Sequence, residues 1–117
     1  MERSAIFPGS FDPFTRGHAA LVDEALNLFD RVVIGIGNNT SKQGLLTVAN
    51  RKRLIDDLYA GNTRVEARIY YPDITTVMLF TPAPVADISS STVREVLSFG
   101  RSVEEFMPVG VDINKYL

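Results

Sequence analysis

The sequence has no cysteine and only one histidine, His18, among its 117 residues. The absence of thiols excludes disulfide bonds, thiolate zinc sites and a cysteine nucleophile. A single histidine also excludes a His-rich metal site and a proton relay between two histidines. Any chemistry must therefore use other side chains, backbone groups or this one imidazole.

Long apolar runs and a surplus of basic residues are missing as well. No apolar run approaches the roughly 20 residues that cross a bilayer. The N-terminal run Ala5-Ile6-Phe7 is too short for the h-region of a secretory signal. Twelve Lys and Arg residues against 14 Asp and Glu residues disfavour a general nucleic-acid-binding surface. We expect a cytoplasmic protein that binds neither membrane nor nucleic acid, although a few focused cations could hold an anionic ligand.

Strand and helix patterns alternate along the chain, and its composition is that of an ordinary globular protein. Strand patterns cover 5–7, 32–37, 65–70 and 75–80. Helical patterns follow the expected N-caps Thr15, Thr47 and either Ser89 or Ser90. The order predicts an α/β, Rossmann-like, doubly wound parallel sheet within one domain over 1–117. The tail, 102–117, should form one or two short helical turns, with Phe106, Val109, Val111, Ile113 and Leu117 available for packing.

One junction does not fit this alternation. Only four residues, Tyr71 to Ile74, separate the third and fourth strand patterns. A crossover between neighbouring parallel strands needs a dozen residues or more. Either these two strands form an antiparallel hairpin, or a central segment is missing near residues 70–74.

The densest chemical signal is the string from Gly9 to His18, Gly-Ser-Phe-Asp-Pro-Phe-Thr-Arg-Gly-His. It joins the first strand to the first helix, and ligands of open α/β sheets bind at the carboxyl ends of strands. The free N–H groups of a first helical turn favour a phosphate, to which His18 could donate a hydrogen bond. A plain turn, cap and surface histidine would explain each residue singly, but the complete string favours function. It is not a Walker A loop, and Gly35-Ile36-Gly37 does not open a dinucleotide-binding fingerprint.

Two weaker signals point to the same edge of the sheet. Hydroxyl groups and an arginine enter the third helix in the stretch Ile88 to Arg94, and they could hold a polyphosphate. An ordinary N-cap and a solvated arginine explain this stretch about equally well. Lys42, in the loop after the second strand, is by itself no more than a solvated lysine.

Together these motifs resemble the nucleotidyltransferase superfamily with the T/H-x-G-H motif, in the form found in bacterial phosphopantetheine adenylyltransferases. The resemblance rests on Gly9–His18, on the Asn39-x-x-Lys42 loop, on Phe80-Thr81-Pro82 and on Ile-Ser-Ser-Ser-x-x-Arg at 88–94. It implies a nucleotidyltransferase fold and transfer of AMP from ATP to 4′-phosphopantetheine, a step of coenzyme A biosynthesis. Mg²⁺ would accompany the nucleotide, and no residue is predicted to ligate a metal.

The resemblance also implies roles for individual residues. His18 would stabilise the transition state at the α-phosphate, and Lys42 would hold the phosphopantetheine phosphate or bridge it to the α-phosphate. Ser10 and Phe11 would contact the substrates, with Ser10 near both phosphate groups. The adenine and polyphosphate site would comprise Val85, Ala86, Asp87, Ile88, Ser89, Ser90 and Ser91, supported by Arg94. The family further suggests a homohexamer and feedback inhibition by coenzyme A.

The sequence departs from this family at the junction noted above. The family has additional α/β structure there, at least one β-α unit of about 30 residues or more. That segment carries an Arg-Gly-x-Arg stretch and an acidic adenine-site residue, which are absent from this sequence. Two alternatives therefore stay open: a related adenylyl- or cytidylyltransferase acting on another phosphate, and a catalytically impaired nucleotide-binding protein.

Overall fold

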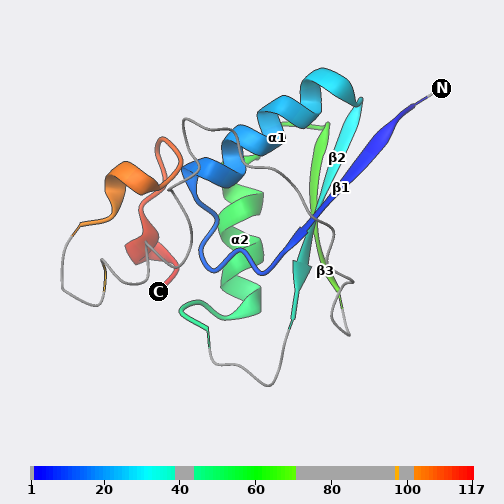
Figure 1. Cartoon of the computed structure of the whole chain (residues 1–117). Coiled ribbons are helices and arrows are strands. Elements are labelled where there is room, and N and C mark those ends of the chain that lie inside the picture. Colours follow the sequence, from blue (N-terminus) through cyan, green and yellow to red (C-terminus); the bar gives the residue numbers. More distant parts are fainter. Residues whose placement is uncertain (1, 39–43, 71–96, 98–101) are drawn as a thin grey trace.

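Three parallel strands lie side by side in the order β1 (Ser4–Gly9), β2 (Arg31–Gly37) and β3 (Val65–Tyr70) (Figure 1). The computed structural model describes residues 2–38, 44–70, 97 and 102–117. The helices α1 (Arg16–Leu28) and α2 (Val48–Leu58) provide the two crossover connections. The α/β prediction with a parallel sheet is confirmed. Within the described residues, no helix is long and apolar enough to span a bilayer.

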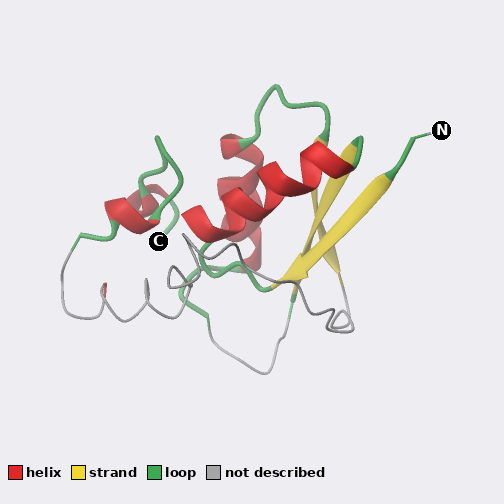
Figure 2. Cartoon of the chain, turned by 45° about the horizontal axis from the view of Figure 1, so that its top comes forward, coloured by secondary structure: helices red, strands yellow, loops and turns green. Residues whose placement is uncertain are grey.

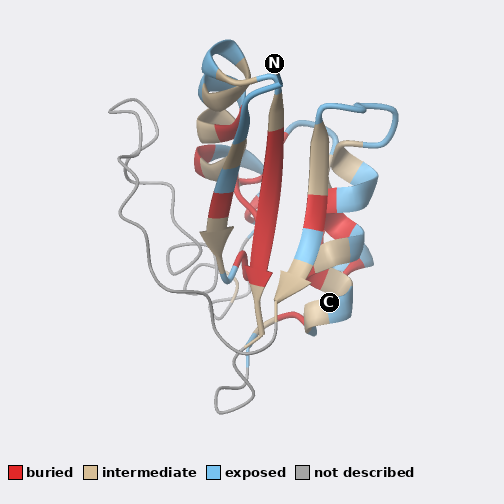
Figure 3. Cartoon of the chain, turned by 90° about the vertical axis from the view of Figure 1, so that its right-hand side faces the viewer, coloured by how far each residue is buried: buried red, intermediate tan, exposed pale blue. Residues whose placement is uncertain are grey.

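The middle strand, β2, is buried along most of its length between the two others (Figure 3). Val32, Ile34 and Ile36 are fully buried, and Val33 is only 8% exposed. An apolar run without alternation is typical of a strand covered on both faces. The sequence predicted this strand correctly apart from one residue at its start.

Both helices lie on the same face of the sheet (Figures 1 and 3). Phe7, Ile34 and Ala67 are aligned across the three strands, and all three belong to the hydrophobic core. The next row, Ile6, Val33 and Glu66, faces the opposite side because successive residues of a strand alternate. Ile6 is 60% exposed there. Among the described residues, the core therefore lies between the sheet and the two helices.

The first strand is longer than the sequence predicted. The pattern placed its end at Phe7, because Pro8-Gly9 interrupts the apolar run, but β1 continues to Gly9. Pro8 aligns with Gly35 and Gly9 with Ile36 of β2. A proline is tolerated here because β1 is an edge strand of the described sheet, where a missing backbone N–H need not break a central ladder.

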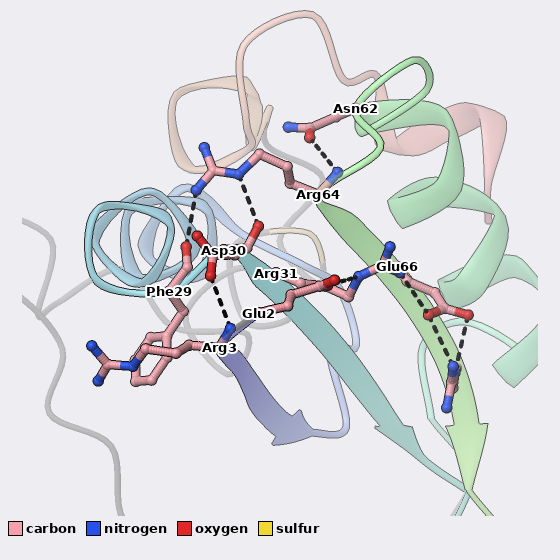
Figure 4. Close-up of polar contacts among 9 residues, drawn as sticks. Glu2, Arg3, Phe29, Asp30, Arg31, Asn62, Arg64 and Glu66 are labelled. Atoms are coloured by element: carbon pink, nitrogen blue, oxygen red, sulfur yellow. Dashed lines mark hydrogen bonds and ion pairs between the residues drawn. The ribbon is translucent and has the colours of Figure 1, made fainter.

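The helix boundaries follow their predicted signals. Thr15 and Thr47 are the N-caps, and the Thr47 side chain accepts a hydrogen bond from Asn50 N at 3.1 Å. Gly61 has a φ of +83° in the turn after α2, a conformation that favours glycine. At the end of α1, Arg64 donates to the backbone oxygens of Phe29 and Asp30 (Figure 4). It also donates to the backbone oxygen of Leu26. This arginine therefore fixes the end of α1 to the start of β3.

The tail forms two short 3₁₀ helices, η2 (Glu104–Phe106) and η3 (Ile113–Lys115), as the sequence predicted. Ile113 is buried as expected, but Val109 is 94% exposed and Leu117 56% exposed. Val109 lies in a turn with Gly110 at a φ of +83°, and this turn carries its side chain away from the core. The buried tail residues that the pattern missed are Val103, Met107, Pro108 and Tyr116.

Other predicted elements lie outside the described residues. These are the strand pattern at 75–80, the loop at 81–87, the helix following Ser89 or Ser90 and the junction Tyr71 to Ile74. They stay predictions, as does the single domain over 1–117.

Candidate functional site

The candidate site begins where β1 ends, in the loop that leads into α1 (Figure 2). The Asp12–Pro13 peptide bond is cis, and Phe11 has a φ of +51°. Residues Phe11 to Thr15 are all buried, whereas Ser10 is exposed. The loop therefore turns most of its side chains inward and leaves Ser10 accessible at the carboxyl edge of the sheet.

His18, in the first turn of α1, is fixed by the residue that caps this helix. Its Nδ1 accepts a hydrogen bond from the backbone N–H of Thr15 at 2.9 Å, and the Thr15 hydroxyl lies 3.2 Å from the same nitrogen. A ring nitrogen that accepts a hydrogen bond carries no proton. In the neutral imidazole the proton is therefore on Nε2, and Nε2–H is the donor of this ring.

Aromatic rings surround this imidazole. The centroids of Phe11, Phe14 and Phe7 lie 5.0, 5.3 and 6.0 Å from that of His18. Burial lowers the pKa of His18 from 6.5 to about 4, because an apolar surrounding disfavours the imidazolium. At neutral pH His18 is thus a neutral hydrogen-bond donor with a defined tautomer.

Packing explains why position 9 is a glycine, which the sequence did not reveal. A Cβ at this position would lie 3.0 to 3.2 Å from three atoms of the Phe11 ring. Gly9 therefore makes room for the buried ring that packs against His18.

The loop between β1 and α1 is held by a buried ion pair, Asp12 and Arg51, which sequence reasoning missed. Asp12 accepts hydrogen bonds from the backbone N–H groups of Leu45 and Leu46, both at 2.7 Å. Arg51 of α2 places its Nε 3.7 Å from Asp12 Oδ1 and donates to Leu46 O at 3.0 Å. The only sequence signal was Asp12 itself, which a turn explained equally well.

The predicted site residues divide into two groups. Ser10, Phe11 and His18 lie together around the end of β1 and the start of α1. Phe11 as a whole residue is only 2% exposed, so its contact with the substrates stays a prediction. Outside the described residues lie Lys42, Val85, Ala86, Asp87, Ile88, Ser89, Ser90, Ser91 and Arg94.

The described residues contain no group of three acidic, His or Cys side chains that could hold a metal ion. Asp12 is the buried carboxylate nearest this site, and its oxygens already accept two backbone N–H groups.

A parallel sheet with a motif loop at the carboxyl end of its first strand defines the class of protein. The model of the cytidylyltransferase-like family matches residues 6–78, which cover β1 to β3 and the whole motif loop. The fold and the sequence thus identify a member of this nucleotidyltransferase class.

Curated relatives define the family more closely. A phosphopantetheine adenylyltransferase of Bacteroides thetaiotaomicron is 31% identical, over 96% of this chain and 99% of the relative. That of Phocaeicola vulgatus is 35% identical with the same coverage. That of Porphyromonas gingivalis is 33% identical over 91% of this chain and 94% of the relative. The chain belongs to the phosphopantetheine adenylyltransferase family.

The lengths of these alignments bear on the junction after β3. The alignment with the Bacteroides relative runs over 150 positions, whereas 96% of this 117-residue chain is about 112 residues. The difference, 150 minus 112, leaves about 38 positions without a counterpart in this chain. This agrees in size with the β-α unit of about 30 residues or more that the sequence lacks. Its place near residues 70–74 stays a prediction.

One solved structure overlaps with part of the chain. A bifunctional NMN adenylyltransferase/ADP ribose pyrophosphatase of Francisella tularensis, complexed with AMP and a Mn ion, is 27% identical with a TM-score of 0.48. The match covers 59% of this chain but only 22% of that protein, which is too partial to bear on function.

Proposed function

We propose that this protein transfers AMP from ATP to 4′-phosphopantetheine. The 4′-phosphate oxygen attacks the α-phosphorus of ATP, the bond from this phosphorus to the bridging oxygen breaks, and pyrophosphate leaves with dephospho-coenzyme A as the other product. The supporting observation is His18, held as a neutral Nε2–H donor beside the exposed end of β1. Membership of the phosphopantetheine adenylyltransferase family supports the same reaction.

The chemistry suits a chain without cysteine. Phosphoryl-type transfer needs positioning and stabilisation of charge, and no covalent nucleophile. His18 would donate to an oxygen of the α-phosphate as negative charge develops there. A neutral donor serves this role over a wide pH range because it need not be protonated first. Ser10 would bind the phosphate groups through its exposed side chain, and the neighbouring Phe11 would contact the substrates.

The rest of the proposed site lies on residues that the structure does not describe. Lys42 would hold the phosphopantetheine phosphate or bridge it to the α-phosphate. The stretch 85–91 and Arg94 would line the adenine and polyphosphate site. Mg²⁺ would arrive bound to the phosphates of ATP, as in other nucleotidyl and phosphoryl transfers. A cytoplasmic homohexamer inhibited by coenzyme A completes the proposal and can be tested by sedimentation and by inhibition assays.

Two other functions compete with this one. A related transferase would use another nucleotide or another phosphate, because the two motifs do not fix the acceptor. Pyrophosphate release with ATP against CTP, and with phosphopantetheine against nicotinamide mononucleotide, separates these substrates. The second alternative is a nucleotide-binding protein without turnover, which the positions lacking a counterpart in this chain favour. It would bind ATP and release no pyrophosphate, and the mass of the intact natural protein shows whether the central segment is absent.

The decisive variant is His18→Asn, because an amide oxygen can still accept a hydrogen bond while the imidazole donor is lost. We expect kcat to fall by about 10²–10³-fold, by analogy with the loss of an oxyanion-hole donor. The matched control is Asn27→Ala, an exposed position in the last turn of the same helix. A His18→Asn enzyme with near-normal kcat would eliminate the proposed role of this histidine.

A further inference from the structure

Arg51 is the most heavily engaged buried charge in the described part of the chain. It lies in the first turns of α2, only 9% exposed, and its guanidinium faces the carboxyl ends of β1 and β2. Its Nε donates to Leu46 O at 3.0 Å, and its Nη1 lies 3.4 Å from Ser10 O and 3.5 Å from Gly37 O. One side chain therefore joins three backbone segments.

Asp12, in the loop after β1, contacts both Arg51 and the residues that precede α2. Its carboxylate lies 3.7 Å from Arg51 Nε and accepts the N–H groups of Leu45 and Leu46. These contacts join the loop after β1 to Gly37 at the end of β2 and to residues 45–46 just before α2. We refer to Asp12 and Arg51 together as the loop clamp. Burying two charges is costly unless they are paired and hydrogen-bonded, and both conditions hold here.

Gly44 shows how closely the segments approach at this clamp. A Cβ on this glycine would overlap Asp12 Oδ2 and would lie 2.8 Å from Arg51 Nη2. Asp12 has a short side chain held by two hydrogen bonds at 2.7 Å, so it cannot move aside without breaking them. The residue that follows the 39–43 segment must therefore be a glycine for the clamp to close.

We propose that Arg51 is a positioning residue for AMP transfer, because with Asp12 and Gly44 it fixes the loop after β1 against residues 44–46, which precede α2. The proposal rests on the proposed function, in which Ser10 and the first turn of α1 bind the reacting phosphates. Ser10 is the direct link, since its carbonyl oxygen contacts Arg51 while its side chain is exposed. Lys42 is only two positions before Gly44 in the sequence. Arg51 touches no substrate and acts through the position of these loops.

The test compares two arginines that both hold backbone carbonyls. Arg51→Met and Arg51→Lys alter the clamp, whereas Arg64→Met and Arg64→Lys alter the cap of α1 at the opposite end of the sheet. All four variants are assayed with ATP and phosphopantetheine at a temperature at which thermal scans show them folded. We expect Arg51→Met to lower kcat by about 10²-fold, which is the effect of displacing a reacting group by roughly 1 Å. The kcat of Arg51→Lys should lie between those of Arg51→Met and the wild type. Both Arg64 variants should have a kcat near that of the wild type. Equal kcat losses in the Arg51 and Arg64 variants would overturn the proposal.

Gly44→Ala tests the same clamp without removing a charge. Gly44 is exposed, so its substitution leaves the core intact even if the Arg51 variants fail to fold. We expect a lowered kcat together with a lower unfolding temperature, because displacing Asp12 breaks its buried hydrogen bonds. Wild-type kcat in this variant would contradict the proposal.

Amide exchange separates this proposal from the proposed function. If the wild-type protein transfers no AMP, the proposed function fails, and the clamp is then judged from the exchange rates of the Leu45 and Leu46 amides. Arg51→Lys should accelerate their exchange by about tenfold or more, and Arg64→Lys should not, because only the former loosens Asp12 and Leu46. Unchanged exchange in Arg51→Lys would show that Arg51 does not hold this loop.

Discussion

Acidification should protonate His18 only well below the pH at which histidines usually titrate. Burial among three phenylalanine rings lowers its pKa from 6.5 to about 4, and the backbone N–H of Thr15 already uses Nδ1 as an acceptor. A proton on Nδ1 would abolish that hydrogen bond. Between pH 4 and pH 6.5 the unfolded chain therefore binds a proton that the folded chain does not.

The sign and size of the effect follow from this difference. A lowered pKa in the folded state means that stability present above pH 6.5 is lost as the pH falls toward 4. A shift from 6.5 to about 4 corresponds to about 3 kcal/mol, at about 1.4 kcal/mol per unit. By pH 4.5 most of this loss has occurred, about 2–3 kcal/mol, which is a large part of the 5–15 kcal/mol that stabilises a typical domain.

The assay is favourable because the chain has a single histidine, so its imidazole NMR signals need no assignment. We expect these signals to show the neutral Nε2–H tautomer down to about pH 5. Urea unfolding at pH 7 and pH 4.5 should show the wild type losing about 2–3 kcal/mol more than His18→Asn, whose carboxylates respond to acid in the same way. An imidazole that titrates at 6.5 or above in the folded protein would refute the reasoning.

Two further substitutions should change stability without changing turnover. Arg64→Met removes charged hydrogen bonds to three carbonyl oxygens at the end of α1. It should lower the free energy of unfolding by about 1–2 kcal/mol and leave kcat unchanged. An unaltered midpoint of urea unfolding would show that these exposed hydrogen bonds contribute nothing to stability. Tyr59→Phe should leave the free energy of unfolding unchanged or raise it by up to about 1 kcal/mol. The Tyr59 hydroxyl is buried without a hydrogen-bond partner among the described residues, and this burial raises the pKa of the phenol. A clear loss of stability in Tyr59→Phe would show that the hydroxyl has a partner.

The sequence predicted the elements whose local pattern and tertiary environment agree. The run from Val32 to Ile36 is apolar on both faces and became the buried middle strand. Thr15 and Thr47 marked the helix starts because their side chains or backbone satisfy free N–H groups there. The end of β1 was misjudged because Pro8 was interpreted as a strand terminator, whereas an edge position tolerates it.

The candidate site was predictable only where residue type implies chemistry. Ser10 and His18 stood out in the motif, and the structure brings both to the same end of β1. Arg51 could not be predicted, because a charge one turn into an amphipathic helix usually points to solvent. Its partners are backbone oxygens of segments that are distant in the sequence. Such contacts leave no trace in residue spacing.

Most residues of the motif loop fix its conformation, and only a few are candidates for contact with a substrate. Gly9 makes room for the Phe11 ring, Asp12 holds the next loop, and Thr15 orients the imidazole. Among these residues, Ser10 presents its side chain at the carboxyl edge of the sheet, while His18 has one ring nitrogen committed to the backbone. The motif therefore builds a rigid support for Ser10 and His18, the two groups proposed to bind the phosphates. A chain that kept Ser10 and His18 but lost Asp12 or its arginine partner would retain these two groups without their relative positions, and positions are what phosphoryl-type transfer needs most.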